Sequence, residues 1–184
     1  HLPVQSGSNK ILNLMNRKHT INEYLNIFDK LKNINSKIEF SSDFIIGYPG
    51  EDEQNFKETL EIIKKIKFIN SYSFIYSSRP GTVAANLKTI DQKILAQRLK
   101  EVQNESFENQ KTMNKTSENK ILTVLVENST KDKNQVFGRS EYMTPVIFNG
   151  KKSDIGKIVS VKIEKSNRST LFGKLINNFT KKVA

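Results

Sequence analysis

The sequence predicts an α/β unit with a parallel sheet, followed by a small all-β barrel. In the first half of the 184-residue chain, apolar segments at strand and helix spacing alternate, whereas from Lys120 onward apolar residues recur at every second position. The charge is uneven as well. Of the net +11, residues 118–184 hold +7, from 13 basic and 6 acidic side chains.

The first elements are a short strand and two helices. Residues 1–5 are apolar and end a predicted strand, and Ser6-Gly7-Ser8 forms a turn that offers a helix N-cap. Thr20 and Glu23 frame a capping box, in which the hydroxyl and the carboxylate each bind a backbone amide of the first helical turn. A helix with one apolar face is therefore expected after Thr20.

A second strand, another helix and a third strand follow. Residues 39–47 are apolar enough for a strand buried on both faces, and Asp52 then caps a helix with an apolar stripe that includes Phe56 and Ile63. Residues 72–76 form the third strand. This βαβαβ order predicts parallel strands joined by right-handed crossovers.

A connector and the β-domain complete the chain. Residues 91–115 contain neither Gly nor Pro, which predicts a long polar helix. Beyond it, five short segments alternate in polarity and are separated by Asn, Gly, Asp and Lys. These strands are expected at residues 121–127, 135–140, 145–148, 158–163 and 169–176. Their number and spacing predict a small barrel of the OB type.

Polar residues at strand tips are the candidates for ligand binding, because ligands of parallel α/β folds bind at the carboxyl ends of the strands. Gln5, Asp43 and Ser77 lie in or just after the three predicted strands. Asp43 interrupts an apolar run, so its carboxylate needs a partner. Ribose hydroxyls would serve, and so would an internal Lys, Arg or backbone amide; position alone does not decide between them.

Composition excludes several classes of chemistry. The chain has no Cys, which excludes disulfides, thiolate zinc sites and Cys-ligated iron–sulfur clusters within it. His1 and His19 lack spaced partners, so no metal site is expected. No segment reaches the ~20 apolar residues of a membrane span, and the polar first twenty residues predict no secretory signal, so we expect a cytoplasmic protein. The positive charge favours a nucleic acid partner, although a genome biased toward Lys and Asn would produce it too.

Four motifs, in this order and spacing, resemble the radical-SAM methylthiotransferases, and the terminal β-domain resembles a TRAM domain, an RNA-binding module. The motifs are HLPVQSGS at 1–8, MNRKHT at 15–20, SDFIIGYPGE at 42–51 and YSFIYSSRPGT at 72–82. The resemblance implies that residues 1–89 form the carboxyl-terminal half of a radical-SAM (β/α) barrel, with strands four to six of the family. Residues 90–117 would be the connecting helix and residues 118–184 the TRAM-like domain.

The resemblance also implies a site for S-adenosylmethionine. Gln5 and Asp43 would contact its ribose or methionine part, and Arg17 would pair with its carboxylate. Ser77 would line the adenine side, and Gly47 would let the backbone approach the ligand. From the residues alone, Arg17 could instead be a surface cation at a helix end.

The β-domain mixes cations with aromatic residues, a combination that suits phosphate contacts and base stacking. The cations expected to bind RNA are Lys120, Arg139, Lys151, Lys152, Lys162 and Arg168. The alternative is a solvated basic surface around an aromatic core.

The chain departs from the family in one respect. Complete enzymes carry two 4Fe–4S clusters, one held by three cysteines of an amino-terminal domain and one by a Cys-x3-Cys-x2-Cys loop; this chain has neither. It is therefore expected to be inactive without the missing amino-terminal half, with which it would form a monomer. The complete enzyme would transfer a methylthio group to isopentenyladenosine next to a tRNA anticodon. The alternatives are a non-catalytic remnant of a split gene that binds only RNA, or a sibling that acts on threonylcarbamoyl-adenosine or a ribosomal protein.

Overall fold

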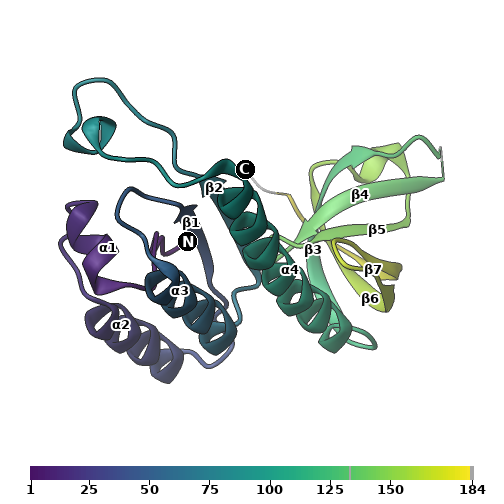
Figure 1. The fold of residues 1–184 in the computed structure, drawn as a ribbon. Helices are drawn as coiled ribbons and strands as arrows, with labels where there is room; N and C mark the ends of the chain where they lie inside the picture. Colours follow the sequence, from purple (N-terminus) through teal and green to yellow (C-terminus); the bar gives the residue numbers. More distant parts are fainter. Residues whose placement is uncertain (133, 183–184) are drawn as a thin grey trace. The chain divides into compact units, whose positions relative to one another are not determined.

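The computed structural model describes residues 1–132 and 134–182 of the chain. It divides into two compact units, one ending at Asn109 and one beginning at Gln110 (Figure 1). The first is a mixed α/β unit, and the second is a closed β-barrel.

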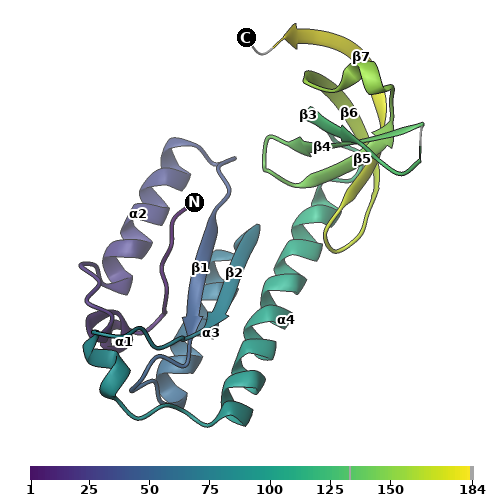
Figure 2. The same ribbon diagram turned by 90° about the horizontal axis from the view of Figure 1, so that it is seen from above.

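The first unit is built on parallel extended segments. Strands β1 (Ser41–Ile46) and β2 (Asn70–Ile75) pair in parallel, and the first residues of the chain run along the other edge of β1 (Figure 2). There the amide of Leu2 donates to the carbonyl of Ser41 at 2.9 Å, and Gln5 forms a parallel bridge with Phe44. The predicted parallel pairing of the second and third segments is confirmed, whereas the first predicted strand, residues 1–5, forms only this isolated bridge.

Five helical segments in the described part of the chain accompany these strands. They are α1 (Asn9–Leu14), α2 (Ile21–Ile34), α3 (Glu53–Ile66), the short η1 (Val83–Asn86) and α4 (Gln92–Thr116). Two of the three predicted N-caps are closed by side chains: Thr20 and Glu23 close a capping box on α2, and Asp52 closes one on α3 with Asn55. Ser8 lies at the N-cap of α1, but its side chain makes no capping hydrogen bond. Hydrogen bonds from backbone amides hold the pKa of Glu23 and of Asp52 below their ordinary values.

Strand β1 is buried on one face only, so the prediction of two buried faces was wrong. Phe44 and Ile46 are fully buried and share a core with Phe56 and Ile63 of α3. Asp43 and Ile45, which point the other way, are only partly buried. Apolarity misled the prediction because the side chain of Ile45 lines a cavity instead of packing beneath a helix.

Tyr24 of α2 provides a test of this core. Its hydroxyl donates to the carbonyl of Leu2 at 2.7 Å, and burial raises its pKa from 10.0 to about 12. Because the folded-state pKa exceeds the unfolded one, this contribution to stability is complete below about pH 10 and declines as the pH rises toward 12. In an alkaline titration followed by phenolate absorbance, Tyr24 is expected to ionise late, and Tyr24→Phe to remove that late phase. If Tyr24→Phe instead lowers the phenolate absorbance by the same fraction at every pH, the expectation is contradicted.

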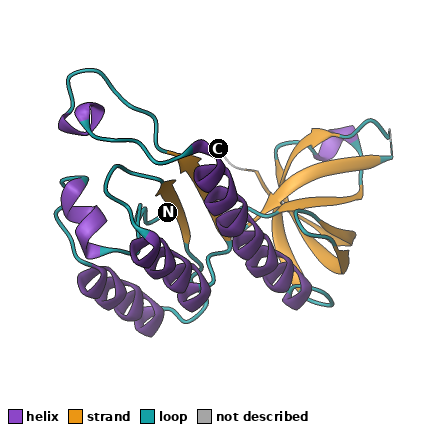
Figure 3. Ribbon diagram, viewed as in Figure 1, coloured by secondary structure: helices purple, strands orange, loops and turns teal. Residues whose placement is uncertain are grey.

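The second unit is a five-stranded barrel (Figure 3). Its strands are β3 (Ile121–Ser129), β4 (Gln135–Ser140), β5 (Pro145–Asn149), β6 (Lys157–Ser166) and β7 (Leu171–Lys182), with η2 (Lys152–Asp154) between β5 and β6. They close in the order β3-β4-β5-β7-β6, in which only the β5–β7 pair is parallel. The five predicted strands are confirmed; β3, β5, β6 and β7 extend beyond their predicted carboxyl ends, and β7 begins at Leu171 instead of residue 169.

Candidate functional site

A cavity of about 600 Å³ lies in the first unit and brings together four of the residues singled out from the sequence. Gln5, Arg17, Asp43 and Ser77, from four separate segments, all line it. The rest of the lining is Met15, Ile45, Tyr48, Phe74, Ile75, Tyr76, Arg79, Thr82 and Ala84.

Gln5 and Asp43 are held side by side by strand pairing. The amide of Gln5 donates to the carbonyl of Asp43 at 3.0 Å, and the carbonyl of Gln5 accepts from the amide of Ile45 at 2.9 Å. Gln5 is 7% exposed and has a left-handed backbone, with φ of 72°. The Asp43 carboxylate lies 3.4 Å from Nε2 of His1, so its recorded partner within the described residues is a histidine and not a Lys, an Arg or a backbone amide.

Arg17 and Ser77 reach the cavity from exposed positions. Arg17 follows the left-handed residue Asn16, and its amide donates to the carbonyl of Leu12 at 2.9 Å, which terminates α1. Within the described part of the chain, its guanidinium has no recorded ion pair. Ser77 follows β2 and is also exposed. Both side chains can therefore bind a ligand without first breaking an internal ion pair.

Aromatic residues complete the cavity and were not predicted. The rings of Tyr48 and Tyr76 meet edge to face, with 5.0 Å between their centroids. Phe74 is 56% exposed. The Tyr48 hydroxyl donates to the carbonyl of Leu14 at 3.0 Å. Burial raises the pKa of Tyr48 above its ordinary value. The alternation of side chains along the strand predicted at residues 72–76 could have indicated that Phe74 and Tyr76 share one face.

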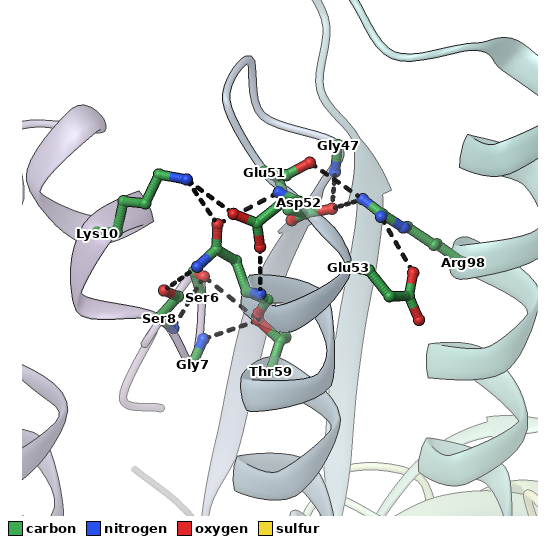
Figure 4. Close-up of polar contacts among 11 residues, drawn as sticks. Ser6, Gly7, Ser8, Lys10, Gly47, Glu51, Asp52, Glu53, Thr59 and Arg98 are labelled. Atoms are coloured by element: carbon green, nitrogen blue, oxygen red, sulfur yellow. Dashed lines mark hydrogen bonds and ion pairs between the residues drawn. The ribbon is translucent and has the colours of Figure 1, made fainter.

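The loop after β1 is held by a buried ion pair (Figure 4). The carboxylate of Glu51 accepts from the amide of Gly47 at 3.0 Å and from Arg98 of α4 at 2.8 Å. The side chain of Glu51 is 0% exposed and that of Arg98 is 8% exposed. Arg98 also lies 3.2 Å from Glu53 and 5.1 Å from the ring centroid of Phe56. Burial raises the pKa of Glu51, while the Gly47 amide and Arg98 act against this increase.

Gly47 itself is not among the cavity-lining residues, and its predicted contact with a ligand stays a prediction. The structure gives another reason for glycine here. The φ of Gly47 is 75°, and a Cβ would come within 2.0 Å of the Leu95 side chain on α4. No local pattern marks Arg98 as the partner of Glu51, because 47 residues separate them.

A second polar cluster fixes the turn after Gln5 against α3 (Figure 4). The amide of Gly7 donates to the hydroxyl of Thr59 at 2.9 Å, and the hydroxyl of Ser6 lies 3.3 Å from the same oxygen. Asn55, in turn, donates to the hydroxyl of Ser8 at 3.0 Å. The SGS turn therefore binds a helix, and this holds the preceding residue, Gln5, at the cavity.

In the second unit, the strand register divides the six predicted RNA-binding cations between the two ends of the barrel. Four lie toward the end where β3 begins and β4 and β6 finish; these are Lys120, Arg139, Lys162 and Arg168. Lys151 and Lys152 lie at the opposite end, beside η2. Arg139 is already engaged, since its Nε lies 3.3 Å from the Glu127 carboxylate.

The aromatic residues of the barrel fall into two groups. Phe148 is 2% exposed and belongs to the barrel core. Its burial agrees with the alternative considered from the sequence, in which the aromatic side chains fill the interior of the barrel. Phe137 and Phe172 are partly exposed, and each ring has a cation above it: Arg139 at 5.8 Å and Lys165 at 5.3 Å from the ring centroid. Phe137 and Phe172 therefore remain accessible for contacts outside the barrel.

Metal and membrane sites were searched across the described ranges. No group of three or more His, Cys, Asp or Glu side chains that could hold a metal ion occurs in them. None of the helices in these ranges is both long and apolar enough to cross a membrane.

Comparison with known proteins identifies both units. The model of the radical SAM superfamily matches residues 1–63, and that of the TRAM domain matches residues 115–176. A tRNA-2-methylthio-N(6)-dimethylallyladenosine synthase of Pelagibacter ubique is 66% identical over 184 residues, which is 100% of this chain and 41% of the relative. Synthases of the same name from Ruthia magnifica and Wolbachia pipientis wMel are 46% and 43% identical over 96% and 94% of the chain, and 40% of each relative.

The chain thus spans about two fifths of the length of these relatives, and the matches extend across both of its units. The radical SAM match comes first along the chain and the TRAM match second. This is the order predicted from the sequence, in which the four motifs precede the β-domain. The chain is therefore related along its whole length to part of the tRNA-2-methylthio-N(6)-dimethylallyladenosine synthases, and it contains a radical SAM match followed by a TRAM match.

Proposed function

We propose that this chain is the cofactor-cradling and RNA-binding part of a tRNA methylthiotransferase. The complete enzyme would convert N6-isopentenyladenosine, next to the anticodon, to its 2-methylthio derivative. Residues 1–89 would form the carboxyl-terminal half of a radical-SAM barrel, residues 90–117 the connecting helix and residues 118–184 the RNA-binding domain. The remaining part of the enzyme would complete a cytoplasmic monomer.

The observation that carries this proposal is the convergence of Gln5, Arg17, Asp43 and Ser77 on one cavity. Its volume of about 600 Å³ lies within the range of small-molecule sites. The lining also suits the chemistry of S-adenosylmethionine. A guanidinium can pair with the carboxylate, a carboxylate and an amide can bind ribose hydroxyls, and exposed aromatic rings can contact adenine.

S-adenosylmethionine supplies a sulfonium whose reductive cleavage needs an electron from an iron–sulfur cluster. Because this chain contains no Cys, the thiolate ligands of both 4Fe–4S clusters must come from the rest of the enzyme. The residues of this chain would orient the cofactor: Arg17 at its carboxylate, Asp43 and Gln5 at its ribose or methionine part, and Ser77 on the adenine side.

A chimaera tests this function. The chain would replace the matching segment of the Pelagibacter ubique relative, to which it is 66% identical, in a host that lacks its own methylthiotransferase. Mass spectrometry of tRNA nucleosides should then detect the 2-methylthio derivative of isopentenyladenosine. Arg17→Met should lower its yield roughly 10-fold or more, since a hydrogen-bonded charge pair contributes about 1.5–3 kcal/mol.

Lys37→Met, which removes an exposed cation outside the cavity, is the matched control and should leave the yield unchanged. A wild-type yield in Arg17→Met would contradict the assignment of the cavity. A methylthio group on threonylcarbamoyl-adenosine would identify the sibling activity, and no modified nucleoside would favour a non-catalytic remnant.

A further inference from the structure

We propose that RNA binds to one face of the barrel, formed by the outward side chains of β6 and β7 and by the start of β3. This inference rests on the proposed RNA-binding function and specifies the surface that performs it. We call this surface the lysine face; its residues are Lys120, Ile121, Lys162, Glu164, Lys165, Phe172, Lys174 and Ile176.

The strand register places these side chains in one row. Lys162 of β6 pairs with Lys174 of β7 on one side and with Ile121 of β3 on the other. Val161 and Ile163, which flank Lys162, are 0% exposed and belong to the barrel core. Since side chains alternate along a strand, Lys162 points outward, and so do its partners across the ladder.

Two lysines directly opposite each other on neighbouring antiparallel strands destabilise a sheet. Both are exposed, and no ion pair is recorded for either within the described ranges. Elsewhere in this unit, cations do have acidic partners: Lys157 lies 3.0 Å from Asp154, and Arg139 lies 3.3 Å from Glu127. A cross-strand pair of lysines that lacks such partners is well suited to bind phosphates, which would relieve the repulsion.

Apolar and aromatic side chains lie between these lysines. Along β7 the outward positions alternate as Phe172, Lys174 and Ile176, and Ile176 is 41% exposed. Ile121 is 61% exposed. Partly exposed Phe172 lies beneath Lys165, whose Nζ is 5.3 Å from the ring centroid. Cations that alternate with accessible rings fit looped or single-stranded RNA, whose unpaired bases can stack while its phosphates meet the lysines.

The lysine face differs from the predicted set of cations. It retains Lys120 and Lys162 and adds Lys165 and Lys174. It leaves out Arg139 and Arg168, and also Lys151 and Lys152, which lie at the other end of the strands. Lys151 and Lys152 provide a control of equal charge within the same unit.

The test measures binding of an unmodified tRNA transcript to the full 184-residue chain by fluorescence anisotropy over a range of salt concentrations. Lys162→Gln combined with Lys174→Gln should weaken binding roughly 10-fold or more at low salt. It should also reduce the slope of log affinity against log salt by about 1.5, because each neutralised phosphate contributes roughly 0.7–0.9. Phe172→Leu should weaken binding roughly 5-fold with the slope unchanged.

Lys151→Gln combined with Lys152→Gln removes the same charge and should change affinity less than about twofold. The thermal midpoint of the Lys162 and Lys174 double variant should equal or exceed that of the wild type, because the repulsion between the two lysines is removed. If the two double variants lose equal affinity, the proposal that the lysine face binds RNA is wrong, but the proposed RNA-binding function of the second unit still stands. Absence of tRNA binding by the wild-type chain at low salt would remove the proposed RNA-binding function itself.

Discussion

Arg98→Met is expected to lower the free energy of unfolding of the first unit by about 3–5 kcal/mol. The substitution leaves the Glu51 carboxylate, which is 0% exposed, without the guanidinium that lies 2.8 Å from it. A buried charge that has lost its partner costs far more than an exposed pair contributes, because water cannot replace the lost interaction. Urea unfolding followed by circular dichroism would measure the loss.

Two further variants separate the causes of that loss. Glu53→Gln removes the other carboxylate near Arg98, but this carboxylate is 65% exposed, so the expected cost is less than about 1 kcal/mol. Glu51→Gln in the Arg98→Met background removes the stranded charge while keeping an oxygen for the Gly47 amide, and should restore much of the stability. An Arg98→Met variant that loses less than about 1 kcal/mol would refute the account.

The pH dependence of Arg98→Met should carry the same signature. Burial already raises the pKa of Glu51, and Arg98 is among the groups that oppose the increase. Without Arg98, the pKa in the folded state lies further above the unfolded value. The variant should therefore lose stability as the pH rises through the folded-state pKa, and its deficit against the wild type should shrink in acid.

Gly7→Ala is expected to destabilise the first unit by about 3 kcal/mol. A Cβ at this position would lie 2.3 Å from the carbonyl oxygen of Glu58 and 2.5 Å from the Cα of Thr59, both in the backbone of α3. A helix backbone cannot move aside as a side chain can, so the turn must separate from α3. Overpacking costs about 1–3 kcal/mol, and the hydrogen bond from Gly7 to Thr59 contributes about 1 more.

Gly81→Ala is the comparison for Gly7→Ala. Gly81 has φ of 82°, and its Cβ would meet no atom within 4 Å, so only backbone strain of about 1 kcal/mol is expected. Chemical denaturation of both variants measures the difference. If the two losses are equal, the close approach of Gly7 to α3 is not what requires glycine there.

Features set by neighbouring residues could be predicted from the sequence, whereas features set by distant contacts could not. The capping box of Thr20 and Glu23 lies within one helical turn, so its residue types reveal it. The convergence of Gln5, Asp43 and Ser77 follows from a general property of parallel strands. The contact between Arg98 and Glu51 spans 47 residues, and no periodicity indicates it.

The same distinction applies to the barrel. Period two along the chain predicted its five strands, but pairing joins segments far apart in sequence, so it did not predict the parallel pairing of β5 with β7. For this reason the six predicted cations could not be sorted by barrel end before the register was known. Lys162 and Lys174 are 12 residues apart in the chain and directly opposite in the structure.

Closure of the barrel separates two kinds of evolutionary constraint. Each strand has a neighbour on both sides, and alternate side chains serve either the interior or the solvent. Replacements among the solvent-facing positions can therefore accumulate without disturbing the packed interior. Descendants of this domain can therefore acquire a different outer surface, suited to a different partner, while inheriting the same scaffold.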